Sequence, residues 1–177
     1  MFFSAPQLKR DSLGLIRSMT RRRNKLATGR EWIAINIPSV DAIDVVLPFA
    51  FQSFVLFLAL DARSVSDPVL QQDCRKLLMA GARFVSVWGP DCSRVHDAFD
   101  LAALELGLNN GDAVIMTSWH ANESLKEAVW FAANAAFPDE AYATAGSALV
   151  LILVGPAEWA AEARQFLLAG TPIADEA

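Results

Sequence analysis

Side chains that can perform acid, base or nucleophilic chemistry gather in two short stretches of this 177-residue sequence. The stretches are VWGPDCSRVHDAFD (87–100) and TSWHANE (117–123), and together they hold both histidines of the protein. A thiol beside an imidazole can act as a nucleophile with its base, and an imidazole beside a carboxylate can move protons. The catalytic candidates are therefore His120, His96, Cys92 and Glu123. The candidates for ligand binding are Asp61, Trp88, Asp91 and Trp119.

Each candidate also has a purely structural interpretation. Asp91 and Ser93 precede a helical pattern and are typical helix caps. Cys92 fits an inert thiol, although its position near a helix N-terminus would lower its pKa. His96 would lie one turn into a helix, where a histidine is more often hydrogen-bonded than catalytic. The spacing of the histidines, Cys92 and Glu123 matches no zinc pattern, so no metal site is predicted.

No motif in the chain identifies a reaction. The phosphate-binding glycine loop, the dinucleotide fingerprint GxGxxG and the nucleophile elbow GxSxG are all absent. A phosphate-accepting receiver domain needs an acidic pair after its first strand and a lysine after its fifth, and this chain has NIPSVD and VGPAEW there. The reaction, the substrate and any cofactor stay unknown from the sequence.

The elements that position these residues follow a regular alternation. Apolar β-favouring runs predict strands at 31–37, 53–62, 83–89, 112–120 and 147–155. Capping residues, Pro and Gly predict helices at 66–82, which Asp67 would cap, at 91–108, at 122–137, which Asn122 or Ser124 would cap, and at 156–170. Segment 41–52 is ambiguous, since Asp41 could cap a short helix that Pro48 ends. Crossovers of this length need parallel strands. We therefore expect an α/β fold, a three-layer α/β/α sandwich with a mostly parallel sheet of about five strands, Rossmann-like or flavodoxin-like.

A sheet of this kind binds ligands at the carboxyl ends of its strands. All eight candidate residues follow strand ends or sit at them. If the third and fourth strands are neighbours, the loops 88–93 and 118–123 face each other, and we expect His96 and His120 to share one shallow pocket. Helix N-termini would direct free N–H groups into that pocket, which suits a small anionic ligand.

Charge is distributed unevenly along the chain. Residues 1–30 hold eight Lys or Arg and one acid, whereas residues 31–177 hold seven bases and nineteen acids. We expect residues 1–30 to be a basic, flexible N-terminal arm, whose place in the native protein stays open, and 31–177 to be a single α/β domain. The acidic body makes nucleic acid an unlikely partner for it, while the basic arm could still bind a polyanion.

Cysteine usage and hydropathy point to a location inside the cell. Cys74 and Cys92 form no CxxC pair, and the basic N-terminus lacks the apolar core of a secretion signal. No apolar run reaches the roughly 18 residues that span a bilayer, so no transmembrane segment is predicted. These features favour a cytoplasmic protein with free thiols.

VWGPDCSRVHDAFD and TSWHANESLKEAVWFAANAAFP, with LILVG later, resemble a small bacterial protein family of unknown function over roughly residues 30–170. The resemblance implies a bacterial cytosolic protein and transfers no catalytic residue. Helix 124–137 reads as apolar nearly all round, which favours a homodimer with Trp130 or Phe131 in the interface.

Three functions stay open from the sequence. The favoured hypothesis is a small-molecule- or partner-binding α/β domain with its site at the C-terminal edge of the sheet. The first alternative is a cytosolic hydrolase or transferase that uses Cys92, His96, His120 and Glu123. The second alternative is a structural homodimerisation module.

Overall fold

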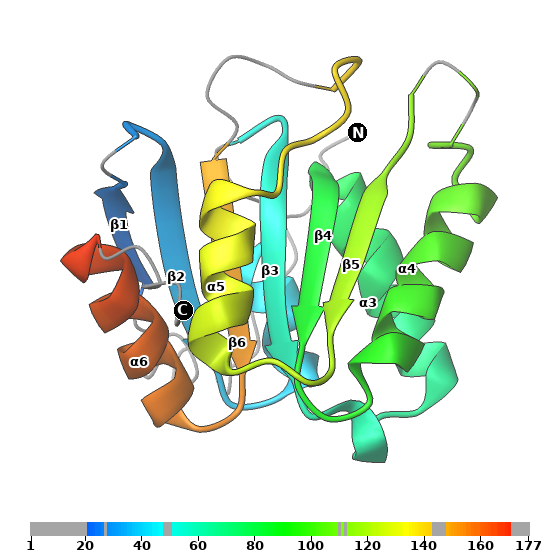
Figure 1. Cartoon of the computed structure of the whole chain (residues 1–177). Helices are drawn as coiled ribbons and strands as arrows, with labels where there is room; N and C mark the ends of the chain where they lie inside the picture. The colour runs from blue at the N-terminus through cyan, green and yellow to red at the C-terminus, as the bar shows by residue number, and fades with distance from the viewer. Residues whose placement is uncertain are drawn as a thin grey trace, which may run out of the picture.

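A computed structural model of the chain describes residues 21–26, 28–47, 51–109, 111, 113–142 and 148–170. Six strands form one sheet (Figure 1): β1 (Arg21–Lys25), β2 (Glu31–Ile37), β3 (Phe54–Leu60), β4 (Ala82–Trp88), β5 (Met116–His120) and β6 (Ala148–Val154). Their order across the sheet is β1-β2-β6-β3-β4-β5. β2 to β6 are mutually parallel, and β1 runs antiparallel to β2.

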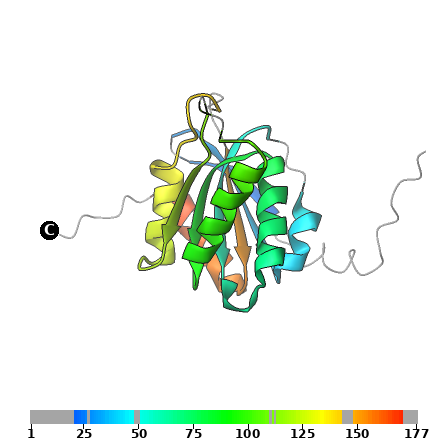
Figure 2. The same cartoon turned by 90° about the vertical axis from the view of Figure 1, so that its right-hand side faces the viewer.

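Helices cover both faces of this sheet, as Figure 2 shows edge-on. One face, the α3/α4 face, carries α3 (Asp67–Met79), α4 (Cys92–Glu105), α2 (Ile43–Val46) and two 3₁₀ turns, η1 (Val40–Ala42) and η2 (Ala62–Ser64). The opposite face, the α5/α6 face, carries α5 (Leu125–Asn134) and α6 (Ala157–Ala169). The expected three-layer α/β/α arrangement is confirmed, with one strand more than the pattern predicted.

The two central strands carry the most apolar sequences of the chain. Every residue of β3 (FVLFLAL) and of β6 (ALVLILV) is buried. Alternate side chains of these strands enter the cores on the two faces, so both faces must be apolar. Burial of apolar side chains on both faces stabilises β3 and β6 at the centre of the sheet. The carboxyl ends of these two strands are thereby held in fixed positions.

Helix termini agree in part with the expected capping residues. Ser124 begins α5 with a capping box, because its hydroxyl accepts from the Glu127 amide while the Glu127 carboxylate accepts from the Ser124 amide. Gly170 ends α6 in the left-handed conformation, at φ 61°. The expected cap Asp67 is wrong: Ser66 is the N-cap of α3 and Asp67 is already its first residue.

Part of the expected N-terminal arm belongs to the fold. Residues 21–25 pair with β2 as an edge strand, and the Arg30 guanidinium is buried, where its Nη1 donates to the carbonyls of Ala132, Ala133 and Ala136 at 3.1–3.2 Å. The sequence RRRNK lacks apolar alternation, so the pattern gave no indication of a strand that forms by backbone pairing. Residues 1–20 of the arm lie outside the described residues.

Helix α5 is amphipathic rather than apolar on all sides. Its buried side is formed by Leu125, Ala128, Val129, Ala132 and Ala133, whereas Lys126, Glu127 and Asn134 are exposed. Phe131 is half-buried against Phe84, with ring centroids 6.2 Å apart. Trp130 is also half-buried. Because α5 has an exposed polar side, its pattern supports a dimer less strongly than an all-apolar helix would, and the homodimer stays a prediction.

Candidate functional site

The chain leaves the sheet toward different faces at neighbouring strand ends. Three strands lead to the α3/α4 face: β2 is followed by η1 and α2, β3 by η2 and α3, and β4 by α4. β5 and β6 lead to the α5/α6 face. Because β6 lies between β2 and β3, and β5 lies beside β4, the connections diverge at two places along the carboxyl edge. Such divergence points are where open α/β sheets bind ligands.

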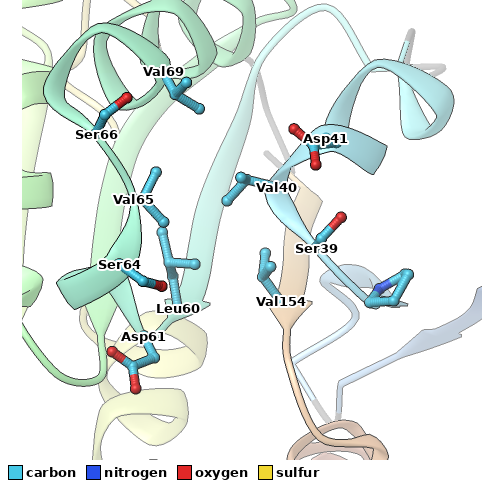
Figure 3. A pocket seen from close by; sticks show the side chains of 11 residues that line it. Ser39, Val40, Asp41, Leu60, Asp61, Ser64, Val65, Ser66, Val69 and Val154 are labelled. Atoms are coloured by element: carbon cyan, nitrogen blue, oxygen red, sulfur yellow. The ribbon is translucent and has the colours of Figure 1, made fainter.

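The first divergence point holds a cavity of about 440 Å³, which we name the β6 crevice (Figure 3). β6 ends at its floor with Val154, while the segment after β2 and the segment after β3 form opposite walls. The apolar lining residues are Pro38, Val40, Leu60, Val65, Val69 and Val154. The polar lining residues are Ser39, Asp41, Asp61, Ser64 and Ser66. Small residues on both walls leave the space between them free.

Asp61 is the sequence-predicted binding residue that the structure places at the β6 crevice. Its carboxylate accepts from Arg63 Nη2 at 2.6 Å, Arg63 Nε at 2.9 Å and the Arg63 amide at 3.2 Å. The hydrogen bonds from the Arg63 guanidinium hold the pKa of Asp61 below its ordinary value. A carboxylate therefore stands at the rim at neutral pH.

Arg94 fixes the β3 wall of the crevice from outside. Its guanidinium donates to Asp91 at 2.7 Å, to Asp67 at 2.6 Å, to the Val65 carbonyl at 3.1 Å and to the Ala62 carbonyl. Hydrogen bonds to Asp91 and then Asp67 raise the pKa of Arg94. Asp91, a predicted ligand residue, has φ 65°, and its carboxylate faces Arg94 rather than capping α4. The hydrogen bonds from Arg94 to the Ala62 and Val65 carbonyls tie η2 to the start of α4.

The second divergence point, between β4 and β5, is filled by the protein itself. β4 and β5 are parallel neighbours, as expected, and their following loops meet. The Trp88 indole N–H donates to the Glu123 carbonyl at 2.9 Å, and the Trp88 ring meets Trp159 edge-on at 5.1 Å between centroids. The predicted wall residue Trp88 thus bridges the two loops.

His120 forms a hydrogen-bonded chain beneath this bridge. Its Nε2 lies 2.9 Å from Ser86 Oγ and 3.3 Å from Ser118 Oγ, and its Nδ1 lies 2.9 Å from Glu123 Oε2. Ser86, His120 and Glu123 therefore have the order of nucleophile, base and acid. However, Ser86 is fully buried and His120 is only 4% exposed, so a substrate carbonyl cannot reach the Ser86 oxygen. The arrangement satisfies buried polar groups.

His96 lies on the other side of the sheet. It projects from α4 to within 3.0 Å of Thr117 Oγ1 and 3.1 Å of the Asp97 carboxylate, with the Trp119 ring 4.6 Å away. Thr117 and Trp119 face α4, whereas His120 shares the α5/α6 face with Phe131, 4.9 Å from it. The expectation that His96 and His120 share one pocket is wrong, because the β5 backbone separates them.

The remaining candidates do not assemble into a reactive site. Cys92 is buried in the core of the α3/α4 face, as is Cys74, whose thiol has its pKa raised by burial. Within the described ranges, no three His, Cys, Asp or Glu side chains are placed to hold a metal ion. Catalytic roles for Cys92, His96, His120 and Glu123 stay predictions, and their separation gives them no common substrate position.

Comparison with known proteins adds a family to this geometry. A family model described as a domain of unknown function, DUF7684, matches residues 36–169. The chain belongs to the DUF7684 family. The DUF7684 match runs from the end of β2 to the end of α6, so it includes both divergence points and leaves out β1. No curated protein matches the sequence. Within the described part of the chain, every helix is too short or too polar to cross a membrane.

Sequence reasoning missed most of the β6 crevice. It considered the polar residues after β3 only through Asp61 and gave no site residue after β2. The indication was present in PSVD (38–41) and ARSVS (62–66), two runs of small residues that follow strands. What the pattern could not supply was the strand order, which inserts β6 between β2 and β3 and so brings these two runs to one cavity.

Proposed function

We propose that this DUF7684 chain is a small-molecule-binding α/β domain whose site is the β6 crevice. The observation that carries the proposal is the cavity of about 440 Å³ at the divergence point over β6. Ligand sites in proteins commonly enclose about 300–1,000 Å³ and combine apolar walls with a few polar groups. The crevice has this size and this composition.

The lining supports a ligand that joins an apolar body to hydroxyl or ammonium groups. Val40, Val65 and Val154 offer apolar contact in the interior, while the carboxylates of Asp41 and Asp61 stand at the rim. Carboxylates accept hydrogen bonds from hydroxyl groups and pair with ammonium groups. The same carboxylates oppose the small anionic ligand that helix N-termini alone would favour.

A binding role is better supported than the hydrolase or transferase alternative. Cys92 and Ser86 are buried, and the two histidines lie on opposite sides of the sheet. We place the protein in the bacterial cytoplasm, and two buried cysteines without a disulfide support that location.

The proposal is tested by filling the crevice. A library of amines, polyols and nucleosides is first screened by thermal shift with the full chain. Val69→Trp, on the first turn of α3, would then occupy the cavity, whereas Gln72→Trp places the same side chain on the solvent side of the same helix. We expect binding to weaken at least about tenfold in the first variant and to persist in the second. Equal binding by both variants, or no binder in the library, would contradict the proposal.

A further inference from the structure

The two edge strands of the sheet differ in charge and therefore in how readily another strand can pair with them. β1, at one edge, has the sequence RRRNK, and charged residues at an edge discourage pairing with other chains. β5, at the other edge, has the sequence MTSWH, without Lys, Arg, Asp, Glu or Pro. Among the described residues β5 pairs with β4 alone, so the outer backbone groups of β5 are open to a further strand (Figure 1).

Exposed apolar side chains accompany this open edge. Trp119 is 53% exposed and Met116 is 43% exposed, and they project to opposite faces of β5. Val114, just before the strand, is also exposed. Large aromatic side chains at a surface are the residues that dominate binding energy in protein interfaces. We name Val114, Met116, Trp119 and the outer backbone of β5 the β5 edge.

Carboxylates flank the β5 edge on the α4 side. Asp100 accepts from the Thr117 hydroxyl at 2.7 Å and keeps half of its side chain exposed, and Asp97, beside His96, is more exposed still. Arg94, the basic residue one turn earlier on α4, is engaged with Asp67 and Asp91. A strand lying along β5 would therefore meet an aromatic ring and two carboxylates on this side.

We infer that the β5 edge binds an extended, Arg- or Lys-containing segment of a partner protein by strand addition. Main-chain hydrogen bonds to β5 would supply affinity, as in other cases of strand addition. On the α4 side, a guanidinium of the partner would stack on Trp119 and pair with Asp97 or Asp100. On the other face, an apolar side chain of the partner would cover Met116. The charge of the flank disfavours a symmetric β5-to-β5 contact between two copies, which would bring like charges together.

The inference is tested with a fluorescent peptide, acetyl-TVRVTVRT-amide, whose arginines project to one face. We expect it to bind the full chain and the charge-reversed TVEVTVET to bind at least about tenfold more weakly. Alternate residues of an extended peptide direct their N–H groups to opposite edges, and only one of these edges can pair with β5. N-methylation of the residues whose N–H groups face β5 should abolish binding, whereas N-methylation of the residues on the other edge should change the affinity by less than about threefold. Backbone amide NMR shifts should concentrate at residues 116–120.

Matched variants separate the aromatic and charge contributions. Trp119→Ala should weaken binding of the peptide about tenfold. Asp97→Asn combined with Asp100→Asn should weaken it about fivefold, and this second loss should vanish at high salt, where charge interactions are screened. Glu140→Gln with Glu158→Gln removes the same charge elsewhere and should leave binding unchanged. Shifts confined to β1 or to the β6 crevice would overturn the inference, as would equal binding of the two peptides. Self-association that Trp119→Ala abolishes would assign the edge to a second copy instead.

Discussion

The carboxyl edge of the sheet carries two divergence points, and their contents differ. At the β6 crevice, walls of serine and valine leave about 440 Å³ free, whereas between β4 and β5 the Trp88 indole fills the gap and donates to Glu123. The strand order creates both places, because it decides where neighbouring connections part. The size of the side chains that follow each strand then decides whether the place becomes a cavity or part of the core.

The same contrast explains why the most chemically suggestive residues are poor candidates for catalysis. His120 lies under the filled divergence point, where Ser86 and Glu123 use both of its ring nitrogens. The residues of the open crevice are less conspicuous in the sequence, but Asp61 and three serines line the free space there. Access, rather than residue type, separates the two regions.

The largest expected effect on stability concerns Gly89, in the turn after β4 that contacts the end of β3 between the two divergence points. Gly89 has φ +118°, and a Cβ added there would lie 2.4 Å from the Leu60 carbonyl oxygen, at the end of β3. Gly89→Ala should lower the free energy of unfolding by about 3 kcal/mol or more, because it combines backbone strain with a clash against main chain. Urea unfolding measures the loss.

Gly107→Ala is the control for this substitution. Gly107 also has positive φ, at +66°, but its Cβ would meet no atom within 4 Å. We expect it to cost about 1–2 kcal/mol, from strain alone. Equal losses in the two variants would show that the contact between β3 and the β4 turn is not rigid, and that the two divergence points can adjust independently.

A smaller effect should follow from emptying the filled gap. Trp88→Ala removes the edge-on contact with Trp159 and leaves the Glu123 carbonyl without its indole donor. We expect a loss of about 2–3 kcal/mol, somewhat less than for a fully buried tryptophan. Trp119→Ala, at the half-exposed tryptophan of the neighbouring strand, should cost less than about 1 kcal/mol. Similar losses for the two tryptophans would contradict the view that Trp88 closes the gap.

Much of the fold follows from local pattern. The continuous apolar runs of β3 and β6 and the capping residue Ser124 predict their elements because the physical cause lies within a few residues. β1 escapes prediction because the sequence RRRNK lacks the apolar alternation that indicates a strand, so only its backbone pairing with β2, the next strand of the chain, reveals it. The crevice escapes for a different reason: its two walls, at 38–41 and 60–69, are separated in the sequence, and only the insertion of β6 makes them opposite. The position of Asp61 at the carboxyl edge could be predicted because the strand-end rule needs no strand order.

The smallest effect concerns the charge that the open crevice presents to a ligand. The Arg63 guanidinium keeps the pKa of Asp61 below its ordinary value of 3.8. Because the folded pKa is the lower one, the interaction contributes to stability above the unfolded pKa and is lost only as the pH falls through the folded value. Both groups are exposed to solvent, so the change in stability should be slight. Carboxyl ¹³C NMR should give a titration midpoint for Asp61 below 3.8, and Arg63→Gln should raise it. Arg75→Gln, which removes a guanidinium paired with Glu105 elsewhere, should leave it unchanged. An unaltered midpoint in Arg63→Gln would mean that the ion pair does not persist in solution, and that the rim carboxylate is free to turn toward a ligand without first releasing an arginine.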